Sequence, residues 1–194
     1  SSWSKNFYND RKMYVMDIDG LNLKCISSNL DQTPSPAIWA SNSSGVYFNV
    51  REFGQSNVYY SDLKGKVKKV TKGNHMLTIN DLVGKNAVAT WTDPTNPSDI
   101  VHFSIENSTK IKRLTNVNED IFYNVEFGKL EEITYTSIDN KKIQGWIVKP
   151  PQFDSNKKYP LVLRIHGGPH SMYHVGFNYN FQLHAAQDQV LLYT

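Results

Sequence analysis

Short apolar runs separated by turn residues fill the first two thirds of the chain. Residues 45–50 and 86–91 are typical runs, and clusters rich in Gly, Asn, Asp and Pro, such as residues 42–45 and 93–97, bound them. Runs of this length with such boundaries are typical of β-strands rather than helices. The first part of the chain is therefore predicted to be a series of short antiparallel strands.

The strand pattern repeats. Residues 15–20 are similar to residues 60–65 and, more faintly, to residues 102–107, and each copy is followed by a short strand with Ser or Thr near its end. A spacing of about 40–45 residues is the length of one four-stranded blade of a β-propeller. Residues 1–127 are therefore predicted to form two to three blades. A free-standing antiparallel β-sandwich is the alternative, and it explains the strands but not the repeat.

Two or three blades do not close a propeller, which needs about four to eight. An unclosed array leaves strand edges that pair with other polypeptide. The sequence therefore predicts a piece of a longer protein, with a second copy or a partner chain on the open edge as the alternative.

The pattern changes near residue 128. A strand at residues 125–137 is predicted to form a hairpin with a strand at residues 143–149, because Asp139 and Asn140 between them favour a turn. An apolar strand at residues 161–165, predicted to be buried on both faces, is followed by a helical pattern at residues 178–188 and by a last strand at 190–194. This order predicts a parallel crossover, so residues 128–194 form a second domain, and the fold class is mostly β with an α/β segment.

A glycine turn ends the apolar strand. The sequence there is His166-Gly167-Gly168-Pro169. Glycines let the backbone turn tightly and approach a ligand, and proline ends the strand. Open α/β sheets place their chemistry beyond the carboxyl ends of the strands, so this turn is the candidate site.

Residues 166–170, with residues 145–151 before them and 176–179 after them, resemble the start of the catalytic domain of the prolyl oligopeptidase family. Acylaminoacyl peptidases and bacterial dipeptidyl peptidases are the most similar members. The resemblance is strong over residues 131–194 and is limited to the repeat pattern before them. It implies the last blades of a β-propeller followed by the first part of an α/β-hydrolase domain.

The same resemblance implies a serine peptidase that hydrolyses short peptides by acyl transfer to serine. The main-chain N–H of Gly168, with Gly167 beside it, is then expected to donate to the oxyanion, and His166 and Pro169 are expected to support the loop. No serine here has the G-x-S-x-G pattern of the nucleophile, and Ser56 comes nearest with one glycine. The triad is expected outside this chain, which is therefore predicted to be inactive alone. A propeller-type protein-binding module and an esterase of the same fold remain as alternatives.

Charge and cysteine content change this picture little. The net charge of +3 is mild, and Lys64, Lys66 and Lys68 alternate as on a solvated strand face, so no nucleic-acid partner is predicted. No apolar run reaches the length of about 18 residues expected of a membrane span. Cys25 is the only cysteine, which slightly favours a reducing compartment. A cytoplasmic location is expected, with a periplasmic or secreted one left open.

Two further clusters are not predicted to be sites. His166, His170 and His174 are four residues apart, but the glycines between the first two oppose a helix, so neither a metal nor another cofactor is expected. Glu131 and Glu132 are neighbours on a predicted strand, where adjacent side chains point to opposite faces, so a structural or solvated role is expected.

Overall fold

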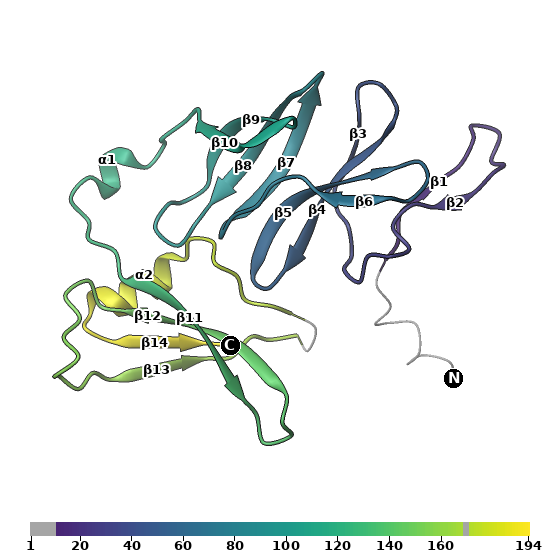
Figure 1. Ribbon diagram of the computed structural model, residues 1–194. Helices are drawn as coiled ribbons and strands as arrows, with labels where there is room; N and C mark the ends of the chain where they lie inside the picture. The colour runs from purple at the N-terminus through teal and green to yellow at the C-terminus, as the bar shows by residue number, and fades with distance from the viewer. Residues whose placement is uncertain (1–10, 169–170) are drawn as a thin grey trace. The chain divides into compact units, whose positions relative to one another are not determined.

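The computed structural model describes residues 11–168 and 171–194, and its fold is mostly β (Figure 1). The chain divides into two compact units. The first comprises the described residues up to Trp91 together with Asp99–Thr115, and the second comprises Thr92–Ser98 together with Asn116–Thr194. No helix among the described residues is long and apolar enough to cross a membrane.

The first unit consists of β-strands. A small hairpin pairs β1 with β2, and the strands from β3 to β10 form one sheet in the order β10-β9-β8-β7-β5-β4-β3, with β6 beside β5. The strands are β1 (Tyr14–Val15), β2 (Lys24–Cys25), β3 (Ala37–Trp39), β4 (Gly45–Glu52), β5 (Gln55–Asp62), β6 (Val67–Lys69), β7 (Met76–Val83), β8 (Asn86–Thr92), β9 (Asp99–Ser104) and β10 (Asn107–Arg113). Two consecutive four-stranded meanders, β3 to β6 and β7 to β10, therefore follow one another along the chain, as the strand pattern predicts.

The turns of the predicted repeat have the same geometry. The N–H of Gly20 donates to the Asp17 carbonyl at 2.9 Å, and the N–H of Gly65 donates to the Asp62 carbonyl at 3.0 Å. Both glycines have positive φ, +83° and +86°, a conformation that side chains with a Cβ rarely adopt. The similarity between residues 15–20 and 60–65 is therefore a structural repeat.

The Ser or Thr after each copy has a common role as well. Its hydroxyl accepts a hydrogen bond from the main-chain N–H of an earlier residue, in the pairs Met13 to Ser27 (2.7 Å), Val58 to Thr71 (2.9 Å) and Ile100 to Thr115 (2.9 Å). Thr71 also donates to Asn57 Oδ1 at 3.1 Å, and Thr115 donates to Asp99 Oδ1 at 2.7 Å. The repeated hydroxyl thus ties the outer strand of each copy to its neighbour.

The core of the first unit lies mainly on the strands of the two meanders. The largest cluster consists of Ala40, Tyr47, Val58, Leu77, Ile79, Leu82, Ala87, Ala89, Val101 and Phe103. A smaller cluster consists of Leu30, Phe48, Val50 and Tyr59. Burial of these side chains is the main favourable contribution to the stability of the unit.

The second unit contains a four-stranded mixed sheet in the order β11-β12-β14-β13. β13 and β14 are parallel, and the other pairs are antiparallel. The elements are α1 (Glu119–Phe122), β11 (Lys129–Thr136), β12 (Lys142–Lys149), β13 (Leu161–Arg164), α2 (Tyr179–Ala186) and β14 (Val190–Tyr193). The predicted hairpin is confirmed, and Asn140 in its turn has a φ of +61°.

Helix α2 packs on one face of this sheet (Figure 1). In the sequence, it lies between β13 and β14. The core there consists of Trp146, Val148, Val175, Phe181, Ala185, Leu191 and Tyr193. Trp146 stacks on Tyr193 with ring centroids 5.3 Å apart, and Phe181 lies 4.6 Å from the same tyrosine ring. The apolar positions of residues 178–188 therefore form the helix that the sequence predicts.

The prediction that the strand after residue 160 is buried on both faces is wrong for this structure. Val162 packs against the core beneath α2, but Leu161 and Leu163 are 63% and 53% exposed. β13 is an edge strand of the described sheet, and helix α2 packs against β12 and β14 on one face of that sheet. The continuous apolar run therefore leaves an apolar surface in contact with solvent.

The last passage of the chain from the first compact unit to the second is at Thr115 and Asn116, so residues 116–127 belong to the second unit. Three phenylalanine rings lie close together in that unit. Phe122 and Phe127 each lie 5.6 Å from the ring of Phe177, and 5.3 Å from one another. These contacts join the segment before β11 to the segment before α2.

Candidate functional site

The glycine turn leaves the sheet at the end of β13. The carbonyl of Arg164, the last residue of the strand, accepts the N–H of Thr194 at 3.3 Å, and the chain then departs from β14. Gly167 and Gly168 are exposed. A Cβ on Gly167 would meet no atom within 4 Å, and Gly168 has a φ of +146°. The backbone is therefore open to an approaching group at Gly167 and has a conformation suited to glycine at Gly168.

The main-chain N–H groups of Gly167 and Gly168 make no hydrogen bond to another group in the described part of the chain. A backbone N–H without a protein partner is satisfied by water or by a ligand. Two consecutive exposed donors beyond the carboxyl end of a parallel strand are well placed for an oxygen that acquires negative charge.

His166 supports the turn. Its Nδ1 lies 2.9 Å from the Gly167 carbonyl oxygen, so the tautomer with hydrogen on Nδ1 donates to that oxygen. Its ring also packs edge to face on Tyr173, with centroids 6.1 Å apart. Tyr173 in turn contacts Phe181 and Tyr193, at 5.7 and 5.2 Å. The turn is thus connected to the core by the predicted supporting histidine and by Tyr173, which sequence reasoning missed because only contacts in space single it out.

Pro169 and His170 lie outside the described residues. His174 is described, and its Nδ1 accepts the N–H of Gly176 at 3.1 Å. Among residues 11–168 and 171–194, no group of three or more His, Cys, Asp or Glu side chains is arranged to hold a metal ion.

The start of α2 is fixed by polar side chains. Asn178 caps the helix by accepting the N–H of Phe181 at 3.2 Å. Gln182 is buried, and its amide accepts the N–H of Gly128 at 2.7 Å and donates to the Pro94 carbonyl at 3.0 Å. A Cβ on Gly128 would lie 2.6 Å from Ala185 Cβ, so only glycine allows this approach. A glutamine among apolar helix positions was the only sequence signal for this contact.

Glu131 and Glu132 point to opposite faces of β11. Glu131 Oε2 accepts Lys149 Nζ at 2.6 Å, and this hydrogen bond holds the pKa of the Glu131 carboxyl below its usual value. Glu132 Oε1 accepts the Gln144 side-chain amide at 2.7 Å. The two carboxylates therefore have separate partners on the neighbouring strand and do not converge on one ligand.

Ser56, the serine nearest to the nucleophile pattern, lies inside the sheet of the first unit. It is buried, and its Oγ donates to the Leu77 carbonyl at 2.8 Å. A buried hydroxyl that is already donating has the role of a structural hydrogen bond rather than of a nucleophile.

No protein-family model matches the chain. Among curated proteins, it is 28% identical to the uncharacterized peptidase YuxL of Bacillus subtilis, over 94% of this chain and 30% of that protein. It is 25% identical to dipeptidyl-peptidase 5 of Porphyromonas gingivalis, over 94% of this chain and 27% of that protein. Among solved structures, acylaminoacyl peptidase of Pyrococcus horikoshii has a TM-score of 0.78 and 26% identity, over 95% of this chain and 28% of that one.

The similarity extends over nearly all of this chain but over a limited part of each relative. The chain spans between 27% and 30% of the length of the three proteins. The chain is thus a relative of the peptidases of the prolyl oligopeptidase family.

Proposed function

We propose that this chain is the boundary region of a serine peptidase, in which residues 1–127 are the last blades of a β-propeller and residues 128–194 begin an α/β-hydrolase domain. The two consecutive meanders, β3 to β6 and β7 to β10, support the first part, because four strands in sequence make one blade. The repeated glycine turns and hydroxyl contacts support it independently of strand number.

The exposed glycine turn is the observation on which the catalytic assignment depends. In α/β-hydrolases, one oxyanion donor belongs to the loop between the third strand and the helix that follows it. β13 is the third strand of the second unit along the chain, α2 follows it, and Gly167 and Gly168 lie between them. Their N–H groups are unengaged in the described part of the chain, as a donor to a substrate carbonyl requires.

The proposed reaction is acyl transfer followed by hydrolysis. A serine Oγ outside these 194 residues attacks the peptide carbonyl carbon, its proton passes through a histidine to the leaving amine, and the C–N bond breaks. Water then releases the acyl group from serine. Gly168 donates its N–H to the carbonyl oxygen as negative charge develops there, and one such donor contributes about 3 to 4 kcal/mol. His166 holds the adjacent Gly167 carbonyl and so orients the turn.

Short peptides are the proposed substrates. The relatives support this proposal, because they include a dipeptidyl-peptidase and an acylaminoacyl peptidase. The uncovered apolar face of β13 supports the view that further polypeptide completes the domain, because parallel strands are ordinarily covered on both faces.

A serine-directed fluorophosphonate tests the proposal on the full-length protein that contains this sequence. We expect covalent labelling of one serine outside residues 1–194, and hydrolysis of short peptide amides that the label abolishes. Absence of labelling would contradict the proposal and favour a binding module. Labelling with turnover of short acyl esters but not of peptide amides would favour an esterase instead.

A further inference from the structure

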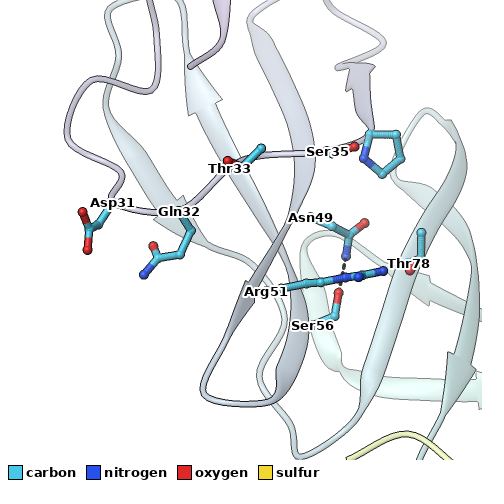
Figure 2. Close-up of a pocket in the computed structure, with 9 residues that line it drawn as sticks. Asp31, Gln32, Thr33, Ser35, Asn49, Arg51, Ser56 and Thr78 are labelled. Atoms are coloured by element: carbon cyan, nitrogen blue, oxygen red, sulfur yellow. Dashed lines mark hydrogen bonds between the residues drawn. The ribbon is translucent and has the colours of Figure 1, made fainter. Parts of the chain in front are cut away.

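The first unit contains a pocket with a volume of about 600 Å³, which is lined mainly by residues with polar side chains (Figure 2). Its walls come from the segment before β3, from the ends of β4 and β5, and from β7. The lining residues include Asp31, Gln32, Thr33, Arg51 and Thr78, above a floor of Asn49 and Ser56. Pockets that hold small ligands have volumes of roughly 300 to 1,000 Å³, so its size suits a small molecule or a short peptide segment.

The floor of the pocket is held rigidly by hydrogen bonds. Asn49 is buried; its side-chain amide donates to the Leu77 carbonyl at 2.5 Å, and its Oδ1 accepts the N–H of Ile79 at 2.9 Å. Asn49 also donates to Ser56 Oγ at 3.3 Å. These groups are fully occupied, so they shape the pocket without needing to bind the ligand themselves.

Arg51 is the cation among the residues that line the pocket. It lies two residues after Asn49 on β4, so both side chains are on the same face of the strand. Figure 2 shows its guanidinium extending toward Thr78. Arg51 is exposed, and none of the ion pairs among residues 11–168 and 171–194 involves it. The carboxylate of its neighbour Glu52 is engaged by Lys69 at 2.6 Å.

The remaining polar groups set the orientation of a ligand. Figure 2 shows Asp31 and Gln32 on the side of the pocket away from the Arg51 guanidinium. A negative group is therefore attracted to the Arg51 end and repelled from the Asp31 end. A guanidinium presents a planar fork of N–H donors that matches the two oxygens of a carboxylate, and the hydroxyl of Thr78 and the amide of Gln32 are suited to peptide groups.

We propose that this pocket binds the carboxylate of a short peptide, with Arg51 as the principal contact. The carboxylate is either the C-terminal group or an Asp or Glu side chain. The peptide character of the ligand rests on the proposed function, whereas the carboxylate preference rests on the pocket alone.

Calorimetric titration of the full-length protein, pretreated with fluorophosphonate so that hydrolysis does not consume the ligand, tests the site. The probes are acetyl-Ala-Ala-Ala with a free carboxylate, the same peptide as its C-terminal amide, and acetyl-Ala-Asp-Ala-amide. We expect the first to bind and the second to bind at least about tenfold more weakly, since hydrogen bonds to charged groups are the strong ones. Binding of the third identifies the side-chain carboxylate as a further source.

Variants of Arg51 test whether this residue contacts the carboxylate of the peptide. Arg51→Gln should weaken binding of the free-carboxylate peptide at least about tenfold, and Arg51→Lys should weaken it less, because lysine keeps the charge but loses the fork. Lys112 is an exposed cation on β10, so Lys112→Gln is the matched control and should leave binding of the peptide unchanged. Equal affinity for acid and amide, undetectable binding of every probe, or an Arg51→Gln variant that binds as wild type would overturn the inference.

Fluorophosphonate labelling of the same preparation separates this result from the proposed function. Labelling without carboxylate binding contradicts only the pocket, whereas Arg51-dependent binding without labelling contradicts only the catalytic proposal.

Discussion

Thr71 shows how one residue connects two strands of the repeat. Its side chain is fully buried, and its hydroxyl accepts the N–H of Val58 and donates to Asn57 Oδ1. Because β5 and the end of β6 depend on the same hydroxyl, the residue joins the outer strand of the first meander to the next one inward.

Thr71→Val should lower the free energy of unfolding by about 1 to 3 kcal/mol, since it leaves two buried polar groups without a partner while preserving volume. Thr109→Val is the control, because the Thr109 hydroxyl belongs to an exposed residue and donates to nearby Asn107. Chemical denaturation measures both. A Thr71→Val variant as stable as the control would show that the hydroxyl is unimportant.

Glu52 is expected to make the stability of the same sheet depend on pH. Burial alone raises its pKa, but hydrogen bonds from Lys69 at 2.6 Å and Tyr59 at 2.5 Å outweigh burial and hold the pKa below its usual value. A carboxyl with a depressed pKa in the folded state stabilises the protein above its unfolded pKa of about 4.3, and this contribution disappears as the pH falls through the folded value.

Glu52→Gln should therefore destabilise the first unit at neutral pH. It should lose this disadvantage as the pH falls from the unfolded pKa of about 4.3 through the lower pKa of the folded state, where the wild-type carboxylate becomes protonated. Free energies of unfolding measured across this pH range should show the values for wild type and variant becoming equal at low pH. Glu106→Gln, which breaks an exposed ion pair with Lys85, should have a small effect at every pH. If the free energies of unfolding of wild type and Glu52→Gln differed by the same amount at every pH, the Glu52 carboxylate would not be the source of this pH dependence.

At the level of elements, β13 differs on its two faces. Val162 contacts the core under α2, whereas Leu163 is 53% exposed. Under the proposed function, the remainder of the domain covers Leu163 in the full-length protein.

Leu163→Ser should change the stability of the 194-residue chain by no more than about 0.5 kcal/mol, as for other exposed positions, but should cost about 2 to 5 kcal/mol in the full-length protein. Val162→Ser, one residue earlier, should destabilise both. If Leu163→Ser changed the stability of both proteins by the same small amount, the face of β13 that carries Leu163 would be uncovered in the full-length protein as well.

Most strands and α2 could be predicted from the sequence, because apolar periodicity and turn residues are local signals. The Asp139-Asn140 turn and the Ser27, Thr71 and Thr115 positions are examples. The exposed face of β13 could not be predicted, since a continuous apolar run does not reveal which face has a covering layer. Contacts between residues distant in sequence, such as Phe122 with Phe177, also leave no local pattern.

The candidate sites differ in the same respect. The glycine turn was found because four consecutive residues form it. The pocket at Arg51 was missed because its walls come from residues as far apart in sequence as Asp31 and Thr78. The proposed oxyanion role of Gly168 rests on family resemblance, and the structure adds an exposed turn whose N–H groups make no hydrogen bond within the described part of the chain.

At the level of the whole molecule, the chain contains two compact units with separate cores, and each contributes a different candidate site. In the second unit, the Gly168 N–H is proposed to bind the oxyanion of a reaction whose nucleophile is proposed to lie outside residues 1–194.

Replacement of Gly168 by glycolic acid in the full-length protein tests this assignment most directly, because it exchanges the N–H for an ester oxygen and adds no side chain. The exchange also weakens the Gly167 carbonyl as acceptor for His166, so His166→Ala provides the control for that contact. We predict that kcat for a short peptide amide falls about 10²- to 10³-fold with KM and thermal stability unchanged, and that His166→Ala lowers it less. An unchanged kcat in the Gly168 ester would contradict the account.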